Sequence, residues 1–120
     1  MSRVAVVGAS AKPERYSNRA LRALQSAGHT PIPVSRLGQD ILGLKGFPAV
    51  SAIPDPVDTI TMYLSPEKQG PVIRDILAAV PRRVIFNPGA ENPQGYAALE
   101  AAAIEVVEAC TLVMLSTGQF

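Results

Sequence analysis

The stretch VAVVGASAKPERYSNRAL, residues 4–21, contains the pattern that indicates the class of fold. Its first four residues are a small and β-branched apolar run, which predicts a buried strand that ends at Gly8. Apolar residues then recur at helical spacing and predict a helix that begins near Ser17 and is closed by Gly28. A strand, a glycine turn and a helix form one βα unit. The start of such a helix is a common binding place for phosphate.

Strand and helix patterns alternate along the rest of the chain. A serine cap followed by proline predicts a helix from Ser65 to about Val80, and the similar Asn92-Pro93 start predicts another over Tyr96 to Ala103. Further strands are predicted at residues 31–34, 58–64, 83–86 and 104–107. Pro33 has no N–H, so we expect the strand at residues 31–34 to lack one hydrogen bond of the sheet. The alternation predicts an α/β protein with a parallel sheet of about five strands and right-handed crossovers.

Length and composition narrow the class of protein. The 120 residues suit one domain over residues 1–120, because no linker or repeat divides them. A net charge of +1 indicates no broad affinity for nucleic acid. The single cysteine excludes an internal disulfide, and the single histidine excludes a histidine-rich metal cluster. No signal-peptide pattern and no apolar run of about 20 residues occurs, so we expect a cytoplasmic protein outside the membrane.

Four loops are expected to meet at one edge of the sheet. In a parallel sheet the carboxyl ends of all strands lie at the same edge, and ligands bind there. The loops that follow the predicted strands at this edge cover residues 8–15, 35–38, 64–68 and 87–92. Taken singly, each could be a turn shaped by its glycines and prolines.

The first of these loops has the features of an anion site. The dinucleotide-binding pattern G-x-G-x-x-G is absent, because Ser10 and Pro13 stand where its second and third glycines would be. Backbone amides and the Ser10 hydroxyl can still donate to a phosphate at the start of the helix. Lys12 and Arg15 add positive charge there. We therefore predict an anion site, with a solvated turn as the alternative.

The end of the second strand separates the candidate nucleotides. Proteins that bind NAD place Asp or Glu there for the ribose hydroxyls, whereas this chain has Ser35 and Arg36. An arginine suits a phosphorylated ribose, which occurs as a 2′-phosphate in NADP and as a 3′-phosphate in coenzyme A (CoA). A plain surface charge remains the alternative for Arg36.

Several segments together resemble a known family. They are VAVVGAS with PER behind it, PIPV at the second strand, ILGLKGFPAVSAIPDPVD before the third, and VVEACTLVM near the end. Over nearly the whole chain these resemble the small CoA-binding proteins of the CoA-binding-domain superfamily, which includes the N-terminal domain of the succinyl-CoA synthetase α subunit. The resemblance implies a Rossmann-like three-layer sandwich that binds CoA or an acyl-CoA. VSR stands where such proteins often have VNP, which leaves the role of Arg36 open.

The resemblance also implies where the parts of CoA lie. It places the phosphates near Gly8, Ala9, Ser10 and Arg15, and the adenosine end near Ser35 and Arg36. Leu64, Ser65 and Pro66 would line the nucleotide, and Asn87, Pro88, Gly89 and Ala90 would flank the pantetheine arm.

No catalytic arrangement is evident, so we expect a binding protein without catalysis of its own. Synthetases of the superfamily use a phosphorylated histidine on a further domain, whereas His29 is expected in a solvated loop at the opposite edge. Ser10 has no histidine and carboxylate partners in the pattern. The acidic residues form no recognisable acid–base pair, and Asp58 could orient a turn. Cys110 is either a buried inert thiol or a reactive one able to pair with the thiol of CoA.

Two other functions remain open from the sequence. An NADP-dependent reductase or redox sensor would use Arg36 for the 2′-phosphate. The CoA-binding subunit of a split acyl-CoA synthetase would show activity only with its partner.

Overall fold

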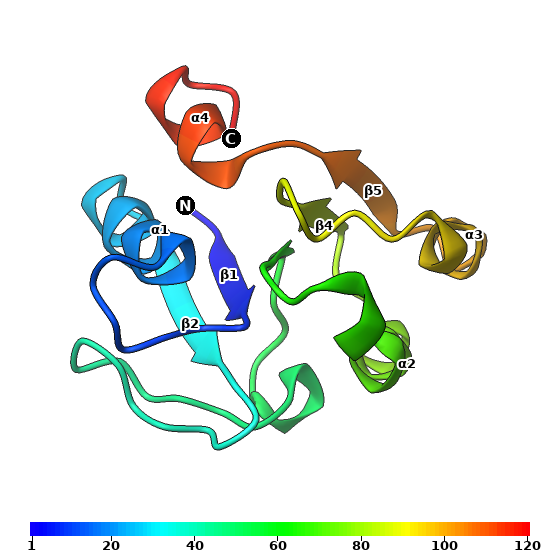
Figure 1. Ribbon diagram of the computed structural model, residues 1–120, viewed down its shortest axis with the longest axis horizontal. Coiled ribbons are helices and arrows are strands. Elements are labelled where there is room, and N and C mark those ends of the chain that lie inside the picture. Colours follow the sequence, from blue (N-terminus) through cyan, green and yellow to red (C-terminus); the bar gives the residue numbers. More distant parts are fainter.

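The computed structural model describes residues 1–120 and has a five-stranded, all-parallel sheet between two layers of helices (Figure 1). The strands are β1 (Arg3–Val7), β2 (Thr30–Val34), β3 (Thr59–Met62), β4 (Arg83–Phe86) and β5 (Glu105–Glu108). The helices are α1 (Tyr16–Ser26), α2 (Gly70–Ala79), α3 (Pro93–Ala101) and α4 (Thr111–Ser116), with short 3₁₀ helices η1 (Val50–Ala52) and η2 (Pro66–Lys68). The strand order is β2-β1-β3-β4-β5. The predicted Rossmann-like α/β fold is confirmed.

Strand β1 is buried on both faces because helices cover the sheet on both sides. Val4 and Val6 pack with α1 residues in one apolar cluster, and Ala5 and Val7 pack in a second cluster that includes Ile73 of α2. Successive side chains of a strand point to opposite faces, so one short run supplies both cores. Helices α1 and α4 contact each other on one face, and α2 and α3 contact each other on the other.

The prolines of β2 are accommodated because β2 is an edge strand. The Thr30 N–H donates to the Ser2 carbonyl beside β1, so Pro31 and Pro33 occupy the alternate positions that face away from β1. On that outer side the Pro33 carbonyl accepts a hydrogen bond from the Phe47 N–H. Pro33 therefore removes no donor from the ladder with β1, and the expected cost does not arise.

The predicted helix from Ser65 to Val80 is divided in two. Residues Pro66–Lys68 form η2, and α2 begins only at Gly70. Pro71 explains the break, because proline has no N–H to continue a helix and its ring collides with the carbonyl four residues earlier. Helix α2 ends at Ala79, and Val80 follows it in the left-handed conformation with φ +47°.

Other element ends also differ from the sequence-based expectation. Helix α1 starts at Tyr16 behind an extended Arg15, one residue before Ser17, and α3 starts at Pro93 instead of Tyr96. The third strand ends at Met62, two residues before Leu64. Helix α4 was not predicted at all.

Candidate functional site

The strand order places a topological switch point beside β1. The chain goes from β1 outward to β2 and then crosses to β3 on the other side of β1. Loops that follow β1 and β3 therefore diverge, which is where ligands bind in open parallel sheets. Because all five strands are parallel, the four predicted loops follow the carboxyl ends of β1, β2, β3 and β4 at one edge, called here the carboxyl edge.

Gly8 brings the loop after β1 against the loop after β3. It has φ +87°, and a Cβ atom there would lie 3.3 Å from the backbone nitrogen of Leu64. The N–H groups of Gly8 and Ala9 donate to the Val34 carbonyl at 2.9 and 3.1 Å. These two amides therefore shape the turn, and the loop's remaining donors begin at Ser10.

Two side chains of α1 hold the loop after β1 in place. Asn18, only 1% exposed, donates from Nδ2 to the Ser10 carbonyl at 2.9 Å, and its Oδ1 accepts from Arg22 Nε at 3.0 Å. Arg22 Nη2 donates to the Pro13 carbonyl at 2.8 Å. Neither residue was predicted as part of the site, although two polar residues four positions apart at the start of the helix are a signal visible in the sequence.

The loop also presents groups that are free to bind an anion. The Ser10 hydroxyl oxygen accepts from the Lys12 N–H at 3.1 Å, which leaves its hydrogen available to a ligand. Lys12 and Arg15 are exposed, and their charged groups have no hydrogen-bond or ion-pair partner in the protein. Arg36, in the loop after β2, is exposed in the same way.

Ser35 has a buried hydroxyl with no hydrogen-bond partner. Its N–H donates to the Phe47 carbonyl at 3.2 Å, and its carbonyl accepts from the Gly38 N–H at 2.9 Å, so the backbone position is well determined. Buried hydroxyls are nearly always hydrogen-bonded in proteins. This one lies at the end of β2, where the adenosine part of a nucleotide is expected.

Gln69 joins the loops after β3 and β4. It is fully buried, and its Nε2 donates to the carbonyls of Leu64 at 2.8 Å and Ala90 at 2.7 Å. Its Oε1 accepts from Asn92 Nδ2 at 3.1 Å. Gln69 was not among the predicted residues, because nothing local in the sequence shows that these loops are neighbours.

The side chain of Asn87 is used within the fold. Its Nδ2 donates to Thr61 Oγ1 at 2.7 Å and to the Met62 carbonyl at 3.0 Å, and its Oδ1 accepts from the Thr111 N–H at 2.8 Å. It thereby ties the end of β4 to β3 and to the start of α4. Gly89 in the same loop has φ +92° and is exposed.

A pocket of about 140 Å³ lies at the carboxyl ends of β1 and β2. Its lining is apolar except for one carboxylate, and it consists of Val7, Val34, Pro48, Ala49, Val50, Pro71, Val72 and Asp75. Asp75 accepts the Ser51 N–H at 3.2 Å with both oxygens. Val34 in its lining directly precedes Ser35, where the adenosine end is predicted to lie.

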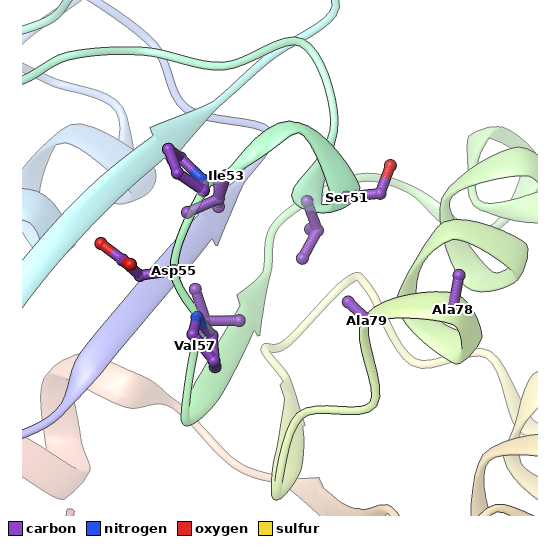
Figure 2. Close-up of a pocket in the computed structure, with 9 residues that line it drawn as sticks. Ser51, Ile53, Asp55, Val57, Ala78 and Ala79 are labelled. Carbon is purple, nitrogen blue, oxygen red and sulfur yellow. The ribbon is translucent and has the colours of Figure 1, made fainter.

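A larger pocket of about 220 Å³ lies away from this edge (Figure 2). Its walls are the segment 50–57, which leads into the start of β3, and Ala78 and Ala79 at the end of α2. Those parts belong to the opposite, amino edge of the sheet. None of the predicted site residues lines it.

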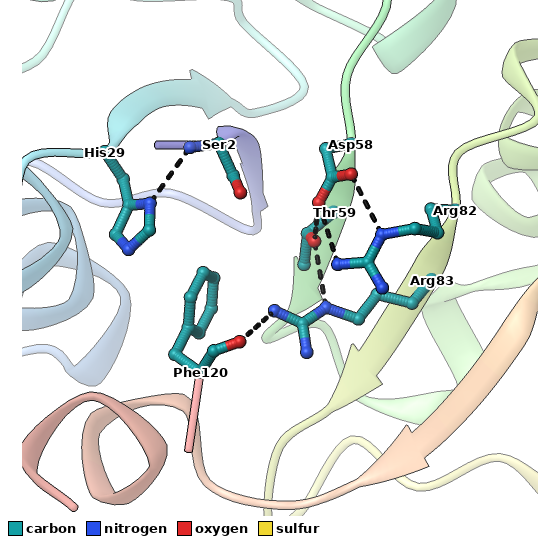
Figure 3. Close-up of polar contacts among 7 residues, drawn as sticks. All are labelled: Ser2, His29, Asp58, Thr59, Arg82, Arg83 and Phe120. Atoms are coloured by element: carbon teal, nitrogen blue, oxygen red, sulfur yellow. Dashed lines mark hydrogen bonds and ion pairs between the residues drawn. The ribbon is translucent and has the colours of Figure 1, made fainter. Parts of the chain in front are cut away.

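The amino edge carries a polar cluster around Asp58 (Figure 3). Arg82 donates to the two carboxylate oxygens of Asp58 at 3.0 and 3.2 Å, and the Thr59 hydroxyl donates at 2.7 Å. The hydrogen bond from Arg82 is the main cause that lowers the pKa of Asp58. Asp58 also accepts the Arg82 N–H with its carbonyl, which fits the expectation that it orients a turn.

His29 lies at this amino edge, as predicted, but it is not a freely solvated residue. It is half-buried, its Nδ1 accepts the Ser2 N–H at 3.0 Å, and its ring lies 4.9 Å from that of Phe120. Burial lowers its pKa, and the nearby positive charges act in the same direction.

Other candidate groups have simple surroundings. Cys110 is a free, half-buried thiol just before α4, and this exposure favours neither the buried inert thiol nor the reactive one. The structure brings no three His, Cys, Asp or Glu side chains together in a way that could hold a metal ion. None of its helices combines the length and the apolar character needed to cross a membrane.

Comparisons with known proteins agree with the fold. Residues 2–116 match the model of the CoA binding domain family. The protein YneT of Bacillus subtilis (strain 168) is 30% identical over 98 residues, which are 82% of this chain and 73% of that one. A crystal structure of an uncharacterized protein is 40% identical, with a TM-score of 0.93 and coverage of 100% of this chain and 98% of that one.

A larger protein contains a similar part. The dinucleotide-forming acetyl-coenzyme A synthetase 1 of Ca. Korarchaeum cryptofilum, solved with phosphate and ADP, is 27% identical with a TM-score of 0.78. The match covers 90% of this chain but only 25% of that chain. Since the family model spans nearly the whole sequence, the chain belongs to the CoA binding domain family.

Proposed function

We propose that this chain binds CoA or an acyl-CoA across the carboxyl edge of the sheet and catalyses no reaction of its own. The observation that carries the proposal is that Lys12, Arg15 and Arg36 are exposed and have no acidic partner, on the loops that follow the adjacent strands β1 and β2 at the carboxyl edge. Unpaired cations beside a helix start favour a polyanion such as the phosphates of CoA.

The phosphates lie on the loop after β1 in this proposal. The Ser10 hydroxyl has a hydrogen free to donate, and Asn18 keeps the Ser10 carbonyl turned toward α1. Gly8 allows the backbone of this loop to pass close to Leu64. Ala9 shapes the turn but offers no donor to a phosphate, because its N–H already donates to the Val34 carbonyl.

The adenosine end is assigned to the end of β2. The unpartnered Ser35 hydroxyl and the exposed Arg36 would meet the ribose and its 3′-phosphate. The apolar pocket of about 140 Å³ beside Val34 suits the flat face of a purine. Leu64, Ser65 and Pro66 are half-buried and line the nucleotide from the loop after β3.

The pantetheine arm then runs toward β4. Pro88 and Gly89 are exposed there, while Ala90 and the Asn87 side chain are buried and support the loop. The absence of catalysis is supported by the surroundings of Ser10. Its partners are the Lys12 N–H and the Asn18 amide, and the one histidine lies at the other edge.

A second candidate function is that of the CoA-binding part of a synthetase with several components. The similar region in an acetyl-CoA synthetase, where this chain matches only a quarter of the whole, favours it. It predicts acyl-CoA ligase activity only when a second protein is added.

Thermal unfolding with added ligands tests the main proposal. CoA should raise the melting temperature by an amount that grows with its concentration, because a ligand that binds only the native state stabilises it. NAD should have no effect. A melting temperature that rises with NADPH and not with CoA would favour a reductase or redox sensor. Native mass spectrometry of freshly purified protein should show CoA as a retained mass.

A further inference from the structure

Charge is distributed very unevenly along this nearly neutral chain. Residues 1–36 contain one acidic residue, Glu14, and six basic ones, which are Arg3, Lys12, Arg15, Arg19, Arg22 and Arg36. Residues 84–120 contain no Lys, Arg or His and four acidic ones, which are Glu91, Glu100, Glu105 and Glu108. The two ends of the chain therefore carry opposite charge, although the net charge of the whole is only +1.

The fold converts this difference in sequence into a difference in space. The strand order β2-β1-β3-β4-β5 puts the basic loops after β1 and β2 at one end of the carboxyl edge. Strands β4 and β5 lie at the other end of the sheet (Figure 1), and Glu91 stands in the loop after β4 while Glu108 is the last residue of β5. The carboxyl edge is therefore positive at the β1 and β2 end and negative at the β4 and β5 end.

Hydrogen bonds hold both carboxylates near the expected pantetheine end. Glu91 Oε1 accepts the Gly89 N–H at 2.8 Å. Glu108 Oε2 accepts the Tyr96 hydroxyl at 2.8 Å, and the Tyr96 oxygen in turn accepts the Asn92 N–H at 3.2 Å. Neither carboxylate forms an ion pair, so no cation neutralises them.

CoA has a matching polarity. Its phosphates are strongly anionic, whereas its pantetheine arm and thiol are uncharged. A gradient along the edge favours the orientation with the phosphates by β1 and β2 and the thiol by β4 and β5. At the thiol end the fixed carboxylates repel a negative acyl group.

We propose that Glu91 and Glu108 act as a charge filter that disfavours acyl-CoA thioesters with a terminal carboxylate and admits free CoA and uncharged acyl groups. This inference rests on the proposed function, because it assumes that the thiol end lies over the loop after β4. It adds the class of acyl group, which the family alone does not specify.

Binding constants for CoA, acetyl-CoA and succinyl-CoA test the filter. At low salt the protein should bind succinyl-CoA roughly three- to tenfold more weakly than acetyl-CoA, since two carboxylates about 10 Å from a negative group produce an effect of this order. The ratio of the two dissociation constants, succinyl-CoA over acetyl-CoA, should fall toward one at high salt, because ions screen charges at this separation.

A pair of matched double variants isolates the position of the charge. Glu91→Gln with Glu108→Gln keeps acceptor oxygens for Gly89 and Tyr96 and should reduce the ratio to near one. Glu100→Gln with Glu105→Gln removes the same charge from the end of α3 and the start of β5, at the amino edge, and should leave the ratio unchanged.

Equal affinity of the wild-type protein for both thioesters overturns the inference, as does a ratio that persists in the Glu91 and Glu108 variant. An equal response of the two double variants would mean that net charge alone acts, and it also overturns the inference. If none of the three ligands binds, the proposed function itself is wrong.

Discussion

The side-chain amide of Asn18 in α1 donates a 2.9 Å hydrogen bond to the carbonyl of Ser10 in the loop after β1. A helix residue thus determines the conformation of a loop eight positions earlier. Asn18→Ala should lower the free energy of unfolding by roughly 1–3 kcal/mol, because the Ser10 carbonyl and Arg22 both lose a partner. It should also weaken CoA binding. Chemical denaturation and calorimetric titration measure the two effects, with the exposed α1 residue in Gln25→Ala as the control.

Substitutions in the same loop address the phosphate contacts directly. Ser10→Leu should abolish CoA binding without unfolding the protein, because Ser10 is a half-buried loop residue that belongs to neither apolar cluster. Arg15→Ala should weaken binding by about 1.5–3 kcal/mol if the guanidinium meets a phosphate. Titration calorimetry gives both affinities. Unaltered affinity in both variants would place the phosphates elsewhere.

Arg36 is tested with two ligands that differ by one phosphate. Arg36→Ala should lose affinity for CoA while its affinity for 3′-dephospho-CoA stays nearly the same, since the smaller ligand lacks the group that Arg36 meets. The cycle of two proteins and two ligands isolates this contact. The loss should shrink at high salt because Arg36 is exposed. Equal losses for both ligands would assign Arg36 to the pyrophosphate or to the fold.

The stability of the amino edge should depend on pH through His29. Its pKa is lower in the folded protein than the ordinary value of 6.5, so the folded state favours neutral imidazole. The contribution of neutral His29 to the free energy of unfolding is therefore complete above about pH 6.5 and is lost as the pH falls below that value. The pKa of Asp58 is also lowered, so the protein should lose further stability below about pH 3.8, where this carboxylate becomes protonated. In His29→Gln the decline just below pH 6.5 should be absent from denaturation curves, while the decline near pH 3.8 remains.

Tyr63 has a buried hydroxyl without a hydrogen-bond partner, and burial raises its pKa to about 12. Tyr63→Phe should therefore leave stability unchanged or raise it by up to about 1 kcal/mol at pH 7. Between pH 10 and about 12 the wild-type protein should lose stability relative to this variant, because only the unfolded tyrosine ionises readily there. Tyr96→Phe is the matched control. It loses bonds to Glu108 and Asn92 and should be destabilised at pH 7.

Much of the architecture could be predicted from local patterns. The apolar run before Gly8 and the alternation of strands and helices indicated the parallel sheet that the structure confirms. The residues quoted for the family resemblance agree with the family match over residues 2–116. These features are readable because strand periodicity and glycine turns act over only a few neighbouring residues. The assignment of individual residues to parts of CoA stays a prediction.

Local sequence patterns were sufficient to predict the α/β class, the turn at Gly8 and the family. That Pro33 removes no hydrogen bond from the ladder with β1 could be seen only in the folded chain, because an edge position is a property of strand order and not of β2 itself. The same holds for the link that Gln69 makes between Leu64 and Ala90, and for the position of Glu91 and Glu108 at one end of the carboxyl edge. Residues far apart in the chain become neighbours only when the crossovers order the strands, and no local pattern records that order.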